Sequence, residues 1–324
     1  MTDKERYRKF CKEEPSIPIY SRDWWLDCIC GKDKWDVILY FSDDYYDKIE
    51  AAFPFYMPYK KGITMPAFTQ TMGIWFNPEF ENENYSKNLL RKQNICDKLI
   101  IQLPEHNFFV QNFHYSFTDW LPFYWKGFKQ TTRYNYILPD IYNINEIKTN
   151  RSYDIKQNIK KAQTKYKIEI KTHIPTDLFL EIYAKTFERQ GEKSYLPEIL
   201  RRLIETVYSR NQGDTFGAFN SDGQLCAAVF VVWQDNCAYY IAGGSDSSGR
   251  KSGAHLLLLS EAINFVSNFS TSFDFEGSMI QGVERVFRSF GATQKQYFTI
   301  SKGRRPLIRA FIKKLNDFFK IGHK

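Results

Sequence analysis

The sequence predicts a mixed α/β protein with two domains of similar size, residues 1–150 and 151–324. Its 324 residues exceed the roughly 100–200 residues usual for one domain. Short runs of aromatic and β-branched residues alternate with runs whose apolar residues recur at helical spacing, which is typical of α/β proteins. Hydrophobic residues make up 43% of the chain and include 28 Phe and 21 Tyr, so a sizeable core is expected.

The first half of the chain is expected to contain three strands and two helices. The strands are predicted at 35–41, 51–62 and 107–117, where aromatic and β-branched residues are concentrated. The helices are predicted at 43–52 and 85–98, the second because its leucines and isoleucine lie near helical spacing.

The middle of the chain is predicted to be mainly helical. A strongly basic helix at 154–166 leads into a short strand at 167–173. A helix with a proline start signal follows and ends near Gly191, and another occupies 197–210, opened by its own proline. The basic helix has two readings, a polyanion-binding surface or a solvated helix face.

The last third predicts a hairpin-rich sheet followed by a loop and a helix. Turn residues at 221–223 and 234–236 divide residues 214–244 into strands, and a Gly- and Ser-rich loop follows at 243–253. The remaining predicted elements are a helix at 254–268, a strand at 272–277, a helix at 282–290, a strand at 295–301 and a basic helix at the end of the chain.

Composition narrows the class of protein. No run approaches the roughly 18 apolar residues of a membrane span, and the charged start MTDKERYRKFCKEE is unlike a signal peptide, so a cytoplasmic protein is expected. Six Cys and five His show no metal-ligand spacing, which predicts chemistry without a metal. The net charge of +8 favours anionic partners such as phosphates, nucleic acid or acidic lipid.

The loop at 243–253 is the first candidate binding site, because amides at a helix N-terminus attract phosphate. Its order of strand, loop and helix fits an acyl-coenzyme A site. Residues 250–255 resemble the R/Q-x-x-G-x-G/A pyrophosphate loop of the GNAT acetyltransferases, which implies phosphate contacts for Arg250 and Gly253, and His255 stands where that pattern has Gly or Ala. Alternatively, the glycines only permit a mobile surface loop. The residues predicted to contact the donor are Gly243, Gly244, Ser245, Arg250 and Gly253.

The strand FDFEG carries the candidate base. Strand alternation places Phe273 and Phe275 on one face, expected to be the buried one, and Asp274 and Glu276 on the other. A carboxylate near a strand end can accept a proton from an attacking ammonium, and Glu276, beside flexible Gly277, is the preferred catalytic candidate. Alternatively, both carboxylates satisfy backbone amides or pair with arginines.

Two basic features lie in the last part of the sequence. Arg288 on the predicted helix 282–290 can bind a phosphate or carboxylate, or form a surface ion pair. The final helix combines an apolar stripe from Leu307 to Phe319 with lysines and arginines. It can dock on an anionic membrane or, as we favour, cover the protein's own core.

With these residues in view, the chain resembles the Fem-type (FemABX) aminoacyltransferases and the related tandem GNAT acyltransferases. The most specific likeness is in YIAGGS, FDFEGS and GVERVFRSFGA, between Tyr239 and Ala292. Weaker likenesses are the basic NRSYDIKQNIKKAQ and TFERQG, which contains Arg189. The Phe-Lys pair that the Fem family uses for its donor and acceptor corresponds to Phe287 and Arg288, where arginine replaces lysine.

The resemblance implies two GNAT-like domains, each a mixed, mostly antiparallel sheet flanked by helices. It implies an acyltransferase in which an amine attacks a thioester or ester, with acyl-coenzyme A or aminoacyl-tRNA as donor. The acceptor would be an amine-bearing small molecule or a cell-wall (peptidoglycan) precursor. Glu276 and Arg288 would be catalytic, and Arg189 and Phe287 would bind substrate. A non-catalytic module on the same scaffold, binding nucleic acid or an anionic membrane, is the alternative.

Overall fold

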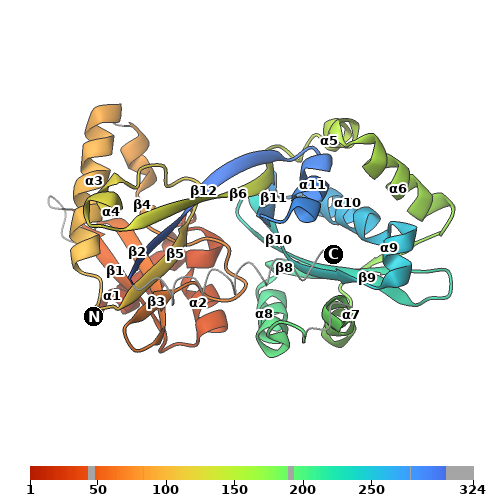
Figure 1. Cartoon of the computed structure of the whole chain (residues 1–324), viewed down its shortest axis with the longest axis horizontal. Coiled ribbons are helices and arrows are strands. Elements are labelled where there is room, and N and C mark those ends of the chain that lie inside the picture. The colour runs from red at the N-terminus through yellow and green to blue at the C-terminus, as the bar shows by residue number, and fades with distance from the viewer. Residues whose placement is uncertain (43–47, 83, 189–192, 278, 304–324) are drawn as a thin grey trace. The chain divides into compact units, whose positions relative to one another are not determined.

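The structure is a computed structural model that describes residues 1–42, 48–82, 84–188, 193–277 and 279–303. The chain forms two compact units, which Figure 1 colours from red to blue along the sequence. The first contains Met1–Arg133 and takes up the chain again at Gln296, and the second contains Tyr134–Lys295. β6 (Lys129–Leu138) and β12 (Thr293–Gly303) therefore have residues in both units.

The first unit is built on a mixed sheet. In order of pairing its strands are β1 (Trp35–Phe41), β2 (Ile49–Tyr59), β3 (Gly62–Thr64), β5 (Phe108–Phe113) and β12. β3 and β5 are parallel, whereas β1 with β2, β2 with β3, and β5 with β12 are antiparallel. The short β4 (Trp75–Phe76) pairs with β2 antiparallel, outside this order.

The helices of the first unit cover a core of phenylalanine. They are α1 (Asp3–Glu13), α2 (Asp23–Cys30), α3 (Tyr85–Ile101) and α4 (Leu121–Trp125), with the 3-10 turns η1 (Ile19–Ser21) and η2 (Pro78–Asn82). Thr2 and Glu5 form a capping box that starts α1. Phe53, Phe113 and Phe123 pack with ring centroids 5.1–6.2 Å apart and are fully buried. These packed rings account for part of the high aromatic content.

One predicted element of this unit is wrong. The helix expected at 43–52 is a strand from Ile49 onward, because Ala51 and Ala52 pair with Tyr40 and Leu39 of β1. Alanine favours helices in isolation, but here its small side chain lies fully buried in the sheet. Residues 43–47 lie outside the described part of the chain.

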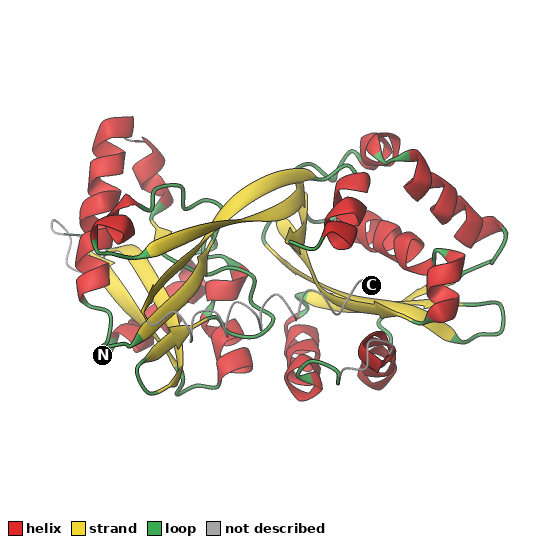
Figure 2. Ribbon diagram, viewed as in Figure 1, coloured by secondary structure: helices red, strands yellow, loops and turns green. Residues whose placement is uncertain are grey.

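The second unit contains a larger sheet with helices on both faces (Figure 2). In order of pairing its strands are β6, β11 (Ser272–Gly277), β10 (Cys237–Ser245), β9 (Leu225–Gln234), β8 (Gly213–Phe219) and β7 (Glu169–Thr172). β10 and β11 are parallel, and the other described pairs of this sheet are antiparallel. Both predicted hairpin turns, at 221–223 and 234–236, are confirmed.

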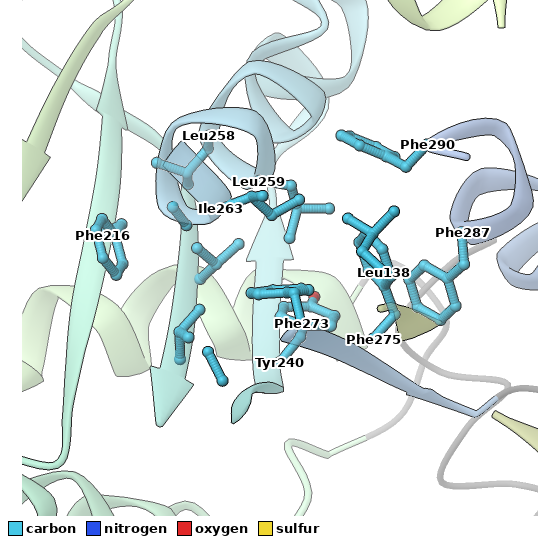
Figure 3. Packing of buried hydrophobic residues seen from close by; sticks show 14 of the residues in the cluster. Leu138, Phe216, Tyr240, Leu258, Leu259, Ile263, Phe273, Phe275, Phe287 and Phe290 are labelled. Carbon is cyan, nitrogen blue, oxygen red and sulfur yellow. The ribbon is translucent and has the colours of Figure 1, made fainter. Parts of the chain in front are cut away.

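The helices of the second unit bury both faces of β9, as Figure 1 shows. On one face Phe230 contacts Phe179 of α7, with ring centroids 6.2 Å apart. On the other face Val229 and Val231 pack into the core beneath α10, which Figure 3 shows from close by. The helices are α5 (Ile144–Asn150), α6 (Tyr153–Thr164), α7 (Thr176–Glu188), α8 (Pro197–Arg210), α9 (Ser247–Ser252), α10 (Ala254–Val266) and α11 (Gln281–Ser289).

The predicted fold class, mixed and mostly antiparallel sheets flanked by helices, is confirmed. The domain division at residue 150 stays a prediction, while the compact units separate after Arg133. The final basic helix, Leu307 to Phe319, lies outside the described residues. None of the described helices combines the length and apolar character that crossing a bilayer requires.

Candidate functional site

The candidate site lies where the two parallel strands of the second unit stop pairing. β10 and β11 share three matched positions, from Cys237 opposite Ser272 to Tyr239 opposite Asp274. On its other side β10 stays paired with β9 as far as Ser245. Beyond Tyr239, the described parallel ladder therefore leaves one edge of β10 without a strand partner. Carboxyl ends of parallel strands are common ligand-binding positions in α/β sheets.

Two of the predicted donor residues are glycines that allow close packing at the end of β10. A Cβ on Gly244 would lie 2.7 Å from both the carbonyl oxygen of Ile182 and Oγ1 of Thr186 on α7. A Cβ on Gly243 would lie 2.5 Å from Oη of Tyr240. The Ser245 amide donates to Thr186 Oγ1 at 3.2 Å. Gly244 and Ser245 are therefore held together at the end of β10, and α7 packs directly against both.

The predicted loop 243–253 is more ordered than the sequence suggested. Its first residues belong to β10, and α9 fills the rest, starting at Asp246, whose Oδ1 accepts from the Gly249 amide at 2.8 Å. Any Cβ on Gly249 would collide with the carbonyl oxygen of Cys226. This glycine is therefore needed for packing, and the alternative of a mobile loop is not what the structure shows.

Arg250 and Gly253, the predicted phosphate contacts, are both used internally. The Arg250 guanidinium donates from Nη1 to the carbonyl oxygen of Ser245 at 2.6 Å. Gly253 has φ of +79°, ends α9 and starts α10, and a Cβ there would lie 2.9 Å from the carbonyl oxygen of Asn158 on α6. α6 thus lies against this turn at Asn158, and the predicted phosphate contact of Arg250 and Gly253 stays a prediction.

The end of β11 contains a β-bulge. Opposite β6, the pairs Asp274–Ile137 and Gly277–Asn135 leave one extra residue on β11. The Asp274 carboxylate accepts from the Glu276 amide at 2.7 Å and from Asn135 Nδ2 at 3.1 Å. Burial raises the pKa of Asp274 to about 7. The sequence left open whether Asp274 is a catalytic carboxylate or a partner for a backbone amide. In the structure it is a partner for a backbone amide.

Glu276 occupies the bulge and has a strained backbone, with φ of +61°. Its side chain is only 8% exposed, and Oε1 has no hydrogen-bond partner among the described residues. Burial raises its pKa well above the usual value for glutamate. The expectation of one buried strand face was wrong, because Asp274 and Glu276 are buried as well as the two phenylalanines.

Aromatic side chains pack beside this strand end. The Phe287 ring stacks on Phe275 with centroids 4.9 Å apart and also approaches Tyr240 at 6.3 Å. Figure 3 shows these three rings together in the core. Phe287 is buried, so its predicted substrate contact requires a ligand that reaches between these rings. His255, at the start of α10, is near Tyr240, and burial lowers its pKa to about 4.

Arg288 lies away from these rings on the exposed face of α11. Its Nε donates to Glu284 Oε1 at 2.7 Å, one helical turn earlier, and its side chain is 63% exposed. Glu284 also accepts from Tyr136 Oη at 3.1 Å. Arg288 and Glu276 are thus in different environments, one solvated and one buried. Arg189 lies outside the described residues.

Sequence reasoning missed two residues of this region. Thr186 links α7 to the end of β10, and Tyr240 contributes a buried hydroxyl beside Gly243. The signal for Thr186 was weak, since a threonine near a helix end is common. Tyr240 begins the YIAGGS likeness, but its packing beside Gly243 could not be read from the sequence, because its neighbours depend on the bulge between Tyr240 and Ala242.

Comparison with known proteins shows which proteins share this fold. Residues 149–278 match the family model described as an acetyltransferase (GNAT) domain. No curated protein matches the chain. Among solved structures, FemX is similar with a TM-score of 0.65 and 12% identity, over 96% of this chain and 98% of that one.

Two other solved structures share the architecture. L-PGS from Bacillus licheniformis is similar with a TM-score of 0.55 and 9% identity, over 99% of this chain and 98% of that one. A tandem GNAT protein from the clavulanic acid biosynthesis pathway is similar with a TM-score of 0.51 and 8% identity, over 93% and 95%. The chain therefore shares its fold with FemX and with this tandem GNAT protein, and the match to the acetyltransferase (GNAT) domain model lies in the second unit.

Proposed function

We propose that this chain is an N-acyltransferase that moves an acyl or aminoacyl group from an activated donor to an amine, at the ends of β10 and β11. The observation that carries the proposal is Glu276, a buried carboxyl group in a strained bulge with an unpaired Oε1. Strained backbone and buried, unpaired carboxyl groups are costly, and they concentrate at functional sites.

Glu276 acts as the base in this mechanism. The acceptor nitrogen attacks the donor carbonyl carbon, forming the new C–N bond, and the C–S or C–O bond to the leaving group breaks. The carboxylate of Glu276 takes a proton from the attacking nitrogen and then passes this proton to the leaving thiolate or alkoxide. A raised pKa suits this role, because it brings the carboxyl group closer to the pKa of an ammonium.

The end of β10 holds the donor in this proposal. An amide beyond Tyr239 that points away from β9 stabilises the developing oxyanion, as backbone amides do in acyl transfer. Gly244 and Ser245 set the position of that amide through their close packing on α7, and Gly243 does so through its packing against Tyr240 and the Ala228 carbonyl oxygen. No step is assigned to Arg250 or Gly253, since both are used within the fold.

Aminoacyl-tRNA is the donor we favour over acyl-coenzyme A. The turn at Arg250 and Gly253 is occupied by internal contacts, which weakens the case for a phosphate loop. In contrast, α6 and the turn after it expose Lys156, Lys160 and Lys165. Exposed lysines bind polyanions, and Arg288 offers a further exposed cation for such a donor. A cell-wall precursor stays the proposed acceptor, and Arg189 a proposed acceptor contact.

The test measures transfer of an acyl or aminoacyl group by the full-length protein. We would supply acetyl-coenzyme A or mixed aminoacyl-tRNA with a muramyl peptide that has a free amine, and follow the new amide by mass spectrometry. Transfer from aminoacyl-tRNA, lost in Glu276→Gln, is the expected result. Saturable binding of coenzyme A with transfer from acetyl-coenzyme A would reverse the choice of donor.

The same experiment separates the transferase from a binding module. No transfer from either donor, with an RNA affinity that falls steeply with salt, would contradict the enzyme and favour a non-catalytic nucleic-acid-binding protein. Affinity for anionic vesicles without transfer would favour the membrane-binding alternative.

A further inference from the structure

The first unit contains a groove beside α3 that the proposed transfer reaction does not use. A pocket of about 580 Å³ lies between the first turns of α3 and residues 116–122, which lead into α4. A second pocket of about 290 Å³ adjoins it. The two together form what we name the α3 groove. The residues that line both pockets are Phe76, Glu81, Lys92, Ser116 and Phe117.

The walls of the α3 groove combine polar and apolar side chains. The rings of Phe76 and Phe117 are nearly parallel, with an angle of 8° and centroids 6.4 Å apart. Leu89, Leu121 and Pro122 also line the larger pocket. Apolar walls with a few polar groups are typical of small-molecule sites, because covering them removes apolar surface from water.

The charged groups of the α3 groove leave a surplus of negative charge. Lys92 pairs with Glu81, so these two charges offset one another. Asp119 accepts from Gln93 Nε2 at 2.8 Å and from the Leu121 amide at 3.0 Å, both neutral donors. Within the described residues no ion pair involves Asp119. His114 in the smaller pocket is uncharged at neutral pH, because burial lowers its pKa to about 4.

A buried side-chain amide lines the larger pocket, and its oxygen accepts no hydrogen bond from the described residues. Asn88 is 8% exposed, and its Nδ2 donates to Glu81 Oε2 at 3.4 Å. Its Oδ1 has no hydrogen-bond partner among the described residues. An unpaired buried acceptor costs free energy, so a ligand that offers an N–H group gains by pairing with it.

We propose that the α3 groove binds an aliphatic primary ammonium compound, such as an alkyl diamine or a lysine side chain. Asn88 Oδ1 and the Asp119 carboxylate accept hydrogen bonds from the ammonium, and Phe76 and Phe117 contact its alkyl part. The Asp119 carboxylate favours a cation through its charge, and the Lys92 ammonium, 5.6 Å from the centroid of the Phe76 ring, shows that a cation can lie beside these rings. An anionic ligand would meet the unpaired carboxylate, so this chemistry excludes it. The inference does not rest on the proposed transferase.

The experiment titrates the full-length protein with cadaverine by isothermal calorimetry. Pentan-1-ol tests the contribution of the alkyl chain alone, and hexanoate tests the sign of the charge. We expect saturable binding of cadaverine, about tenfold or more tighter than either control, a factor that corresponds to roughly 1.4 kcal/mol. Equal binding of all three compounds, or no saturation by cadaverine at 10 mM, would overturn the proposal.

Two variants at Thr118, one with a negative and one with a positive side chain, test the site without disturbing the fold. Thr118 lines the larger pocket and is exposed, so its replacement leaves the core intact. Thr118→Asp should tighten cadaverine binding and Thr118→Lys should weaken it, each by about threefold at low salt. Asp119→Asn, which keeps an oxygen for the Leu121 amide, should weaken binding by about tenfold. Glu105→Gln, which alters an exposed ion pair with Lys61 outside the groove, should change nothing. Identical affinities in both Thr118 variants would contradict the assigned site.

Discussion

The backbone amide of Glu276 donates a 2.7 Å hydrogen bond to Oδ1 of Asp274, two residues earlier on the same strand. This bond holds the bulge at the end of β11 and turns Glu276 into a left-handed backbone conformation. The two carboxyl groups consequently have different tasks. Asp274 maintains the shape of the strand end, and Glu276 is left with an unpaired oxygen.

Asp274 should make stability depend on pH. Burial raises its pKa to about 7 in the folded protein, against an ordinary value of 3.8 for aspartate. Between these values the folded state binds the extra proton, so the free energy of unfolding falls as pH rises, by at most ~1.4 kcal/mol per pH unit. Above about pH 7 this contribution is constant. Urea unfolding at several pH values should show a shallower slope in Asp274→Asn than in wild type, and an unchanged slope in exposed Asp222→Asn.

Glu276→Gln should abolish the pH dependence of transfer that comes from the base. In wild type the rate should rise as pH increases through the raised pKa of Glu276, because only the carboxylate accepts a proton. The amide of glutamine cannot do so, and a loss of about 10²–10⁴ in kcat is expected. Glu198→Gln, on the exposed side of α8, is the control. Wild-type rates in Glu276→Gln would remove Glu276 from the mechanism.

Glu276→Gly and Glu276→Ala should separate backbone strain from side-chain chemistry. Both remove the buried carboxyl group, but only glycine adopts φ of +61° without a steric penalty. The glycine variant should therefore be more stable than the alanine variant by about 1 kcal/mol. Thermal and urea unfolding measure the difference. Equal stabilities would mean that the bulge relaxes and stores no strain.

Gly244→Ala should destabilise the second unit. The new Cβ would lie 2.7 Å from the Ile182 carbonyl oxygen, so β10 and α7 must separate. Such overpacking costs about 1–3 kcal/mol. Gly282→Ala, at an exposed position in α11, should be neutral or slightly stabilising, since alanine favours helices. If both variants unfold alike, the close approach of α7 at Gly244 is not a constraint.

Arg288→Ala should leave the stability of the protein nearly unchanged, because its ion pair with Glu284 is exposed. Its proposed contact with a polyanionic donor should appear as an increase of KM for that donor, with kcat retained. Arg201→Ala, another exposed arginine in an ion pair, is the matched control. Equal KM values in the two variants would mean that Arg288 forms only a surface ion pair and does not contact the donor.

Much of the fold could be predicted from the sequence, because local patterns decide it. The periodicity of α3 and the alternating hairpins of β8 to β10 were readable without tertiary information. The segment from Ile49 was misread, since the pairing of Ala51 with Tyr40 is not encoded locally. At the site, the strand FDFEG was found, but the burial of Asp274 and Glu276 depends on neighbours distant in sequence.

The glycine loop illustrates a second limit of sequence reasoning. Glycines can indicate either ligand approach or close packing, and only coordinates distinguish them. Gly249 and Gly253 contact Cys226 and Asn158 of the protein itself. The α3 groove was not predicted at all, because its lining residues are scattered from Ser16 to Pro122 without a motif.

The placement of β12 has a consequence for synthesis on the ribosome. β12 pairs with β5 from Phe298 to Gly303, so the sheet of the first unit is completed by residues made after the whole second unit. Until then the β5 edge is unpaired, and exposed strand edges promote association between chains. The sheet of the first unit can therefore be completed only after β12 has been synthesised, and slow translation of the second unit prolongs the time in which the β5 edge stays exposed.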